Sequence, residues 1–148
     1  MGIQHYENVY GDISCHMLLP YGTDDLVNGN IHIINGTVDY FFVAIQERFP
    51  VELLFQSSLG LPDYVSLPLI GEEGGWVSDH YVLAYSKQRI AFRVTPKNHG
   101  LTGDSLVDRV VFYTQSPNYK CDPYYYEWAI LEQERIPLYP RTVASNCK

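Results

Sequence analysis

The sequence predicts a mostly β fold: an antiparallel β-sandwich or jelly-roll-like single domain with one or two short helices. Short runs of β-branched and aromatic residues recur along the chain, and turn signals separate them at about ten-residue spacing. The composition, 46% hydrophobic and 18% charged, is that of a globular chain. A chain of 148 residues can bury one core without a metal or a disulfide framework. We therefore expect one domain over 1–148.

Eight segments are predicted as strands from their content and from the turn signals between them. The clearest is the hairpin around Ser86 and Lys87, because its second arm alternates apolar and other residues with a period of two, which predicts one buried and one wet face. The predicted strands are 4–10, 13–19, 30–34, 51–56, 64–70, 77–85, 88–95 and 106–114.

Two further segments carry mixed signals. Apolar residues between Val38 and Phe49 recur at helical spacing, whereas the preceding Asn35-Gly36 turn and the aromatic content favour the second arm of a hairpin. Both alternatives stay open for 38–49. In 123–135, the Asp122-Pro123 start slightly favours a short helix over a strand. The segment 136–148 is compatible with an extended C-terminal tail.

Charge is distributed unevenly along the chain, whose formal net charge is −7. Residues 1–86 hold eleven carboxylates and one cation, whereas residues 87–148 hold nine cations and six carboxylates. Nucleic acid is not an expected partner, because phosphate binding needs a clustered excess of Lys and Arg. If the halves form separate faces, head-to-tail contact between copies is favoured. If they interleave in one sheet, which we favour, the charges neutralise each other internally.

No window approaches the roughly 20 apolar residues that cross a bilayer, so no membrane span is expected. The first twenty residues hold carboxylates and no Lys or Arg, unlike a secretory signal. The expected location is the cytoplasm or a virion, with secretion only if a signal was removed before residue 1. Cys15, Cys121 and Cys147 are expected as reduced thiols, although a Cys121–Cys147 bridge stays open because both lie near the C-terminal end.

Motifs for catalysis, cofactors or metals are missing from the sequence. The five histidines lack zinc-site spacing, and no nucleotide loop or nucleophile motif is present. The pairs Cys15-His16 and Asp79-His80 cannot hydrogen bond within one strand, since strand neighbours point to opposite faces. The acidic segment 24–30 is interpreted as a turn and not as a calcium loop. We expect no enzyme, no cofactor and no metal.

Candidate contact residues fall into three groups. Loop 71–81 could present Trp76 to a sugar or peptide. Basic residues at 87, 89 and 93 share a face if they lie on one strand, the alternative being pairing with carboxylates on neighbouring strands. At least one of three successive tyrosines must be exposed, and another tyrosine lies in the Pro-containing tail. The candidates are Trp76, Lys87, Arg89, Arg93, Tyr124, Tyr125, Tyr126 and Tyr139.

These observations predict a non-catalytic structural or interaction subunit. It would contact copies of itself or a neighbouring protein in an assembly such as a virus or phage particle, as a homo-oligomer or assembly component. The first alternative is a lectin-like carbohydrate or small-ligand module. The second is an acidic immunity-type or inhibitor protein that binds a basic partner.

Overall fold

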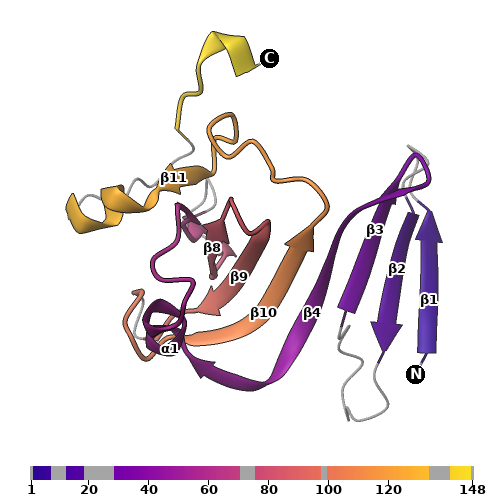
Figure 1. Cartoon of the computed structure of the whole chain (residues 1–148), viewed down its shortest axis with the longest axis horizontal. Helices are drawn as coiled ribbons and strands as arrows, with labels where there is room; N and C mark the ends of the chain where they lie inside the picture. Colours follow the sequence, from indigo (N-terminus) through magenta and orange to yellow (C-terminus); the bar gives the residue numbers. More distant parts are fainter. Residues whose placement is uncertain are drawn as a thin grey trace.

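An antiparallel sheet of nine strands organises the chain (Figure 1), in the order β1-β2-β3-β4-β10-β9-β8-β5-β11. The computed structural model describes residues 2–7, 13–18, 29–70, 76–97, 100–133 and 141–147. The strands of this sheet are β1 (Gly2–Glu7), β2 (Ile13–Leu18), β3 (Gly29–Ile34), β4 (Thr37–Pro50), β5 (Tyr64–Ser66), β8 (Tyr81–Tyr85), β9 (Ile90–Thr95), β10 (Leu106–Tyr113) and β11 (Tyr125–Glu127).

Four smaller elements complete the described residues: a ribbon of β6 (Leu69–Ile70) and β7 (Trp76–Ser78), the helix α1 (Val51–Gln56), and the 3-10 helices η1 (Trp128–Gln133) and η2 (Ser145–Cys147). The mostly β prediction is confirmed. No second large sheet faces the first within the described ranges, so the sandwich or jelly-roll arrangement stays a prediction. Among the same residues, no helix is long and apolar enough to cross a membrane.

Segment 38–49, for which the sequence leaves both helix and strand open, lies in the long strand β4, the second arm of a hairpin. Asn35 and Gly36 have φ of 50° and 76°, as a two-residue turn with positive φ at both positions requires. β4 pairs with β3 and then with β10. In Figure 1 it curves from the β1–β3 group to α1, and in the sheet order it lies between β3 and β10.

The predicted strand at 51–56 is wrong, because this segment is helix α1. Val51 and Leu54 are 0% and 5% exposed, whereas Leu53 is 56% exposed, which is the spacing of a helix with one buried side. The N–H groups of Val51 and Glu52 donate to the carbonyls of Ser105 and Gly103. The loop before β10 thus satisfies N–H groups that have no partner within a first helical turn.

Apolar residues cover both faces of the sheet at β8 and β9. On one face, Leu83 and Val94 pack with α1 in the main core. On the other, Ala84 and Ala91 pack against Tyr119. Ala91 is 0% exposed, so the predicted wet face of this hairpin is wrong, because the chain after β10 returns to cover it.

The remaining predicted elements differ in their bounds. Segments 64–70 and 77–85 are each broken into two strands, β5 with β6 and β7 with β8. The predicted helix at 123–135 is instead strand β11 followed by η1. Only its second part is helical, and there the helix is of the 3-10 type.

The acidic and basic halves of the sequence interleave in the sheet, since β9 and β10 lie between β4 and β8. The charge asymmetry along the chain is therefore mixed within one sheet, as we favoured. This arrangement removes the basis for a head-to-tail contact between two oppositely charged faces.

Candidate functional site

An open groove of about 420 Å³ lies where β5 and β11 pair near the β8–β9 turn. The backbone N–H of Trp128 donates to the Asp63 carbonyl at 3.0 Å, which joins the ends of the two strands. The Trp128 ring packs on Phe55 of α1 at a centroid distance of 5.4 Å. The groove is lined by Pro62, Asp63, Tyr64, Ser86, Glu127, Trp128 and Ala129.

Two exposed carboxylates, Asp63 and Glu127, give the groove its charge. Asp63 Oδ2 accepts hydrogen bonds from the Ser86 backbone N–H at 2.8 Å and from its hydroxyl at 2.6 Å. Neither carboxylate forms an ion pair within the described part of the chain. Aromatic residues beside exposed carboxylates suit a cation or the hydroxyl groups of a sugar.

Glu127 also lines a second, smaller cavity of about 140 Å³ with Lys120 and Arg141. No ion pair joins Glu127 to either residue within the described ranges. Glu127 and Tyr64 line both spaces, so the pair forms the wall between them. Local sequence patterns carry no signal for this groove, because its residues come from three separate segments, 62–64, 86 and 127–129.

The predicted basic stripe of Lys87, Arg89 and Arg93 does not form. The β8–β9 loop spans residues 86–89, with Arg89 at a φ of 57°, so Lys87 and Arg89 lie in the turn and not on β9. Both are exposed. Arg89 Nη1 donates to the Thr114 carbonyl at 2.8 Å, which fixes this side chain over the end of β10.

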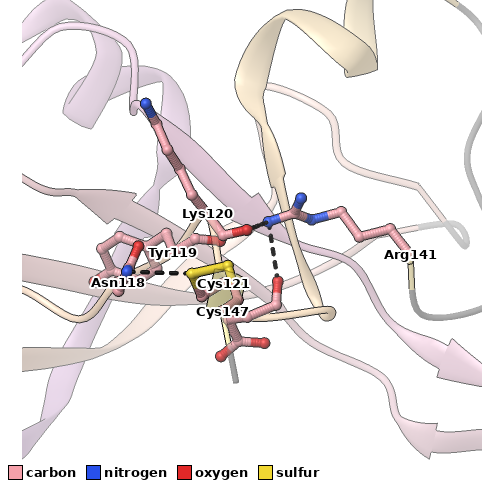
Figure 2. The surroundings of a disulfide bond; sticks show 7 residues. Asn118, Tyr119, Lys120, Cys121, Arg141 and Cys147 are labelled. Atoms are coloured by element: carbon pink, nitrogen blue, oxygen red, sulfur yellow. Dashed lines mark hydrogen bonds between the residues drawn. A yellow bond between two sulfur atoms is a disulfide. The ribbon is translucent and has the colours of Figure 1, made fainter. Parts of the chain in front are cut away.

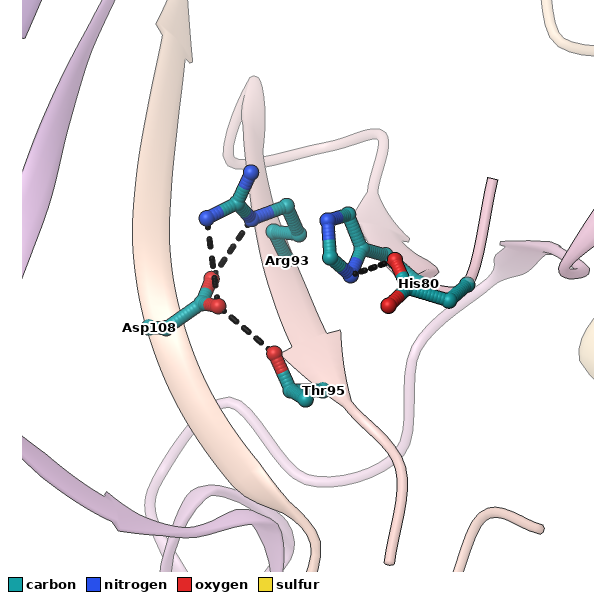
Figure 3. Close-up of polar contacts among 5 residues, drawn as sticks. His80, Arg93, Thr95 and Asp108 are labelled. Atoms are coloured by element: carbon teal, nitrogen blue, oxygen red, sulfur yellow. Dashed lines mark hydrogen bonds and ion pairs between the residues drawn. The ribbon is translucent and has the colours of Figure 1, made fainter. Parts of the chain in front are cut away.

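Arg93 lies in a polar cluster between β9 and β10 (Figure 3). Its Nε donates to Asp108 Oδ1 at 2.7 Å, and its Nη2 donates to Oδ2 at 3.1 Å. The Thr95 hydroxyl donates to Oδ2 at 2.7 Å. Burial raises the pKa of the Asp108 carboxyl, but hydrogen bonds from Arg93 and Thr95 outweigh it and hold the pKa below its ordinary value. Arg93 is therefore paired internally with a neighbouring strand.

His80 lies beside this cluster and contacts the preceding carboxylate (Figure 3). Its Nδ1 is 2.9 Å from Asp79 Oδ1. The prediction that Asp79 and His80 lie within one strand is wrong, because both lie between β7 and β8, so the restriction that a strand would place on their contact does not apply. Burial, followed by the charge of Arg93, lowers the pKa of His80, so the imidazole is neutral at neutral pH.

Only the first of the three successive tyrosines is a surface residue. Tyr124 is 43% exposed, which confirms that at least one reaches the surface. Tyr126 is 6% exposed in the main core, and the ring of Tyr125 lies tilted against that of Tyr119 at a centroid distance of 4.7 Å. Tyr126 is thus buried and is not an exposed contact residue, whereas Tyr125 is only partly buried, because strand β11 turns one to each face of the sheet. Burial also raises the pKa of nearby Tyr113 to about 12.

A disulfide joins Cys121 to Cys147, so the expectation of reduced thiols is wrong for these two residues (Figure 2). Arg141 reaches over the same loop: its Nε donates to the Tyr125 carbonyl at 2.6 Å, and its Nη2 donates to the carbonyls of Tyr119, Lys120 and Asp122. Residues 141–147 are therefore held against the loop before β11 and are not a free tail. Sequence reasoning missed this role of Arg141.

Several predicted residues lie wholly or partly outside the described structure. Residues 24–28 and 71–75 and Tyr139 are not described, and Trp76 is described as part of β7 through its backbone alone. Their predicted roles stay predictions.

Comparisons with family models, curated proteins and solved structures found no match to this chain. The functional proposal therefore rests on the geometry.

Proposed function

We propose that this protein is a non-catalytic interaction subunit that contacts copies of itself or a neighbouring protein in an assembly, as virus and phage particles require. The open groove beside the β8–β9 turn carries this proposal. It combines two exposed carboxylates, which form no ion pair within the described residues, with the half-buried Tyr64 and Trp128, next to the exposed Lys87. Aromatic anchors with a polar rim are the usual composition of a protein contact surface.

The polar cluster of His80, Arg93 and Asp108 supports a structural role for the groups that would otherwise suggest chemistry. Asp108 accepts hydrogen bonds from Arg93 and Thr95, and Arg93 donates to Asp108. A carboxylate held in this way is a poor general base, because its pKa is lowered and its lone pairs are engaged. Surface contact is therefore the function that we favour for this chain.

Sedimentation over a wide concentration range, alone and with the products of neighbouring genes, tests this proposal. We expect either self-association or a stable complex with one neighbour. A strict monomer at millimolar concentration that binds none of these products would contradict it.

A lectin-like module is the second candidate, because Tyr64 and Trp128 beside Asp63 and Glu127 also suit stacking on a sugar ring and binding its hydroxyls. The predicted jelly-roll arrangement belongs to both proposals, since such double sheets occur in capsid and lectin domains. A glycan array separates them: sugar binding that Glu127→Gln removes would favour the lectin. An inhibitor of a basic partner remains a third proposal, resting on the net charge of −7.

A further inference from the structure

We propose that the groove receives the Lys87 side chain of a second copy of this chain, so that two copies associate about a two-fold axis and each fills the groove of the other. The inference rests on the proposed interaction function and names its partner.

Lys87 and the groove that would receive it lie next to each other on one surface. Ser86 lines the groove, is bonded to Asp63 through its backbone N–H and its hydroxyl, and directly precedes Lys87 in the turn. In a two-fold interface, if Lys87 of one copy enters the groove of the other, then Lys87 of that other copy enters the groove of the first. Adjacent complementary sites therefore give two identical contacts in each dimer.

The charges on this surface are complementary, and no ion pair engages them within the described residues. Lys87 is exposed and forms no ion pair within the described residues, whereas the neighbouring Arg89 is engaged with the Thr114 carbonyl. Asp63 uses Oδ2 for Ser86, which leaves Oδ1 without a partner among the described residues. Among the described residues, the turn thus offers one cation without an ion pair, and the groove offers two such carboxylates.

The groove also has the size and lining for a lysine. Its volume of about 420 Å³ lies within the range of small-ligand sites, which leaves room for a long side chain and the adjoining turn. Trp128 can contact the methylene groups and the ammonium of the incoming side chain. A carboxylate on the ammonium gives a charge-assisted hydrogen bond.

Charge reversal tests the contact by sedimentation velocity on the full chain, first at low salt and then at high salt. We expect Lys87→Glu and Glu127→Lys each to weaken the dimer roughly tenfold or more. The doubly reversed variant should recover most of the wild-type affinity, because each copy again presents opposite charges. Higher salt should weaken the wild-type dimer.

Matched controls come from β4, where Arg48 and Glu47 are exposed and lie far along the sheet from the turn. Arg48→Glu and Glu47→Lys change the net charge by the same amounts and should leave the dimer unchanged. Lys120→Gln, in the smaller cavity, should also leave it unchanged. Circular dichroism of every variant establishes that the fold is retained.

Three outcomes overturn the inference, and each bears differently on the proposed function. A dimer that is insensitive to both reversals, or that the double reversal fails to restore, excludes this groove contact but supports self-association. A monomeric wild-type chain that binds a neighbouring protein excludes the second copy and keeps the interaction function. A monomer that binds nothing removes both proposals.

Discussion

Asp108 binds Arg93 through two hydrogen bonds across neighbouring strands, at 2.7 and 3.1 Å, while itself only 4% exposed. The pair lies where the register between β9 and β10 shifts, between Val107 and Arg109. The shift inserts Asp108 as an extra residue in β10, so that its carboxylate meets both Arg93 and Thr95.

Removing this carboxylate leaves a guanidinium without its partner, so Asp108→Ala should lower the free energy of unfolding by about 3 kcal/mol. Urea unfolding at neutral pH measures the loss. Asp104→Ala is the control, because Asp104 pairs with Lys97 at 3.5 Å on the exposed surface. An equal effect of both substitutions would contradict a structural role specific to Asp108.

Low pH should remove the stabilisation that the ionised Asp108 provides. The pKa of Asp108 is lower in the folded chain than in the unfolded chain, so folding is favoured by the ionised form. The contribution is complete above the ordinary carboxyl pKa of about 4 and is lost as the pH falls through the lower folded value. The difference in unfolding free energy between the wild type and Asp108→Asn should therefore shrink in acid. A difference that stays constant down to pH 2 would contradict the assignment.

Neighbouring leucines of α1 provide a test of the helix. Leu54→Ala should cost about 3 kcal/mol, because Leu54 is 5% exposed in the main core. Leu53→Ala should change stability by less than about 0.5 kcal/mol, because Leu53 is 56% exposed. Denaturant unfolding of the two variants decides the matter, and the reverse order would indicate a strand with Leu53 inward.

The β3–β4 turn depends on a glycine. Gly36 has a φ of 76°, so Gly36→Ala should destabilise the fold by about 1 kcal/mol. Gly100→Ala is the matched control, since no atom lies within 4 Å of the added methyl group and its φ is not in the strained range. Thermal unfolding compares them; equal midpoints would argue against the turn.

The disulfide should be seen in thiol counts. Protein purified without reductant and then denatured should show one free thiol out of three cysteines, and three after reduction. Because the bridge spans 26 residues, Cys147→Ser should lower the free energy of unfolding by about 3 kcal/mol. Reductant should destabilise the wild type and leave Cys147→Ser unchanged. Three thiols before reduction would exclude the bridge.

Features that depend on local chemistry can be predicted from the sequence. Runs of β-branched and aromatic residues place most strands, and Asn35-Gly36 places the β3–β4 turn because few other dipeptides adopt positive φ twice. Alternation from Ile90 to Val94 correctly predicts the buried face that meets α1. For Val51 to Gln56, local content favours a strand, but the loop carbonyls of Ser105 and Gly103 and the core beneath stabilise a helix instead.

Tertiary structure alone decided which distant residues meet. Arg93 pairs within the sheet because the β10 irregularity presents Asp108 to it, and Tyr125 is partly covered because the chain after β10 folds back over β8 and β9. The groove likewise needs Asp63, Ser86 and Glu127 from three separate segments. Local preferences fix the conformation of a few adjacent residues. The pairing of strands depends on the free energy of the whole core, which no single segment of sequence determines.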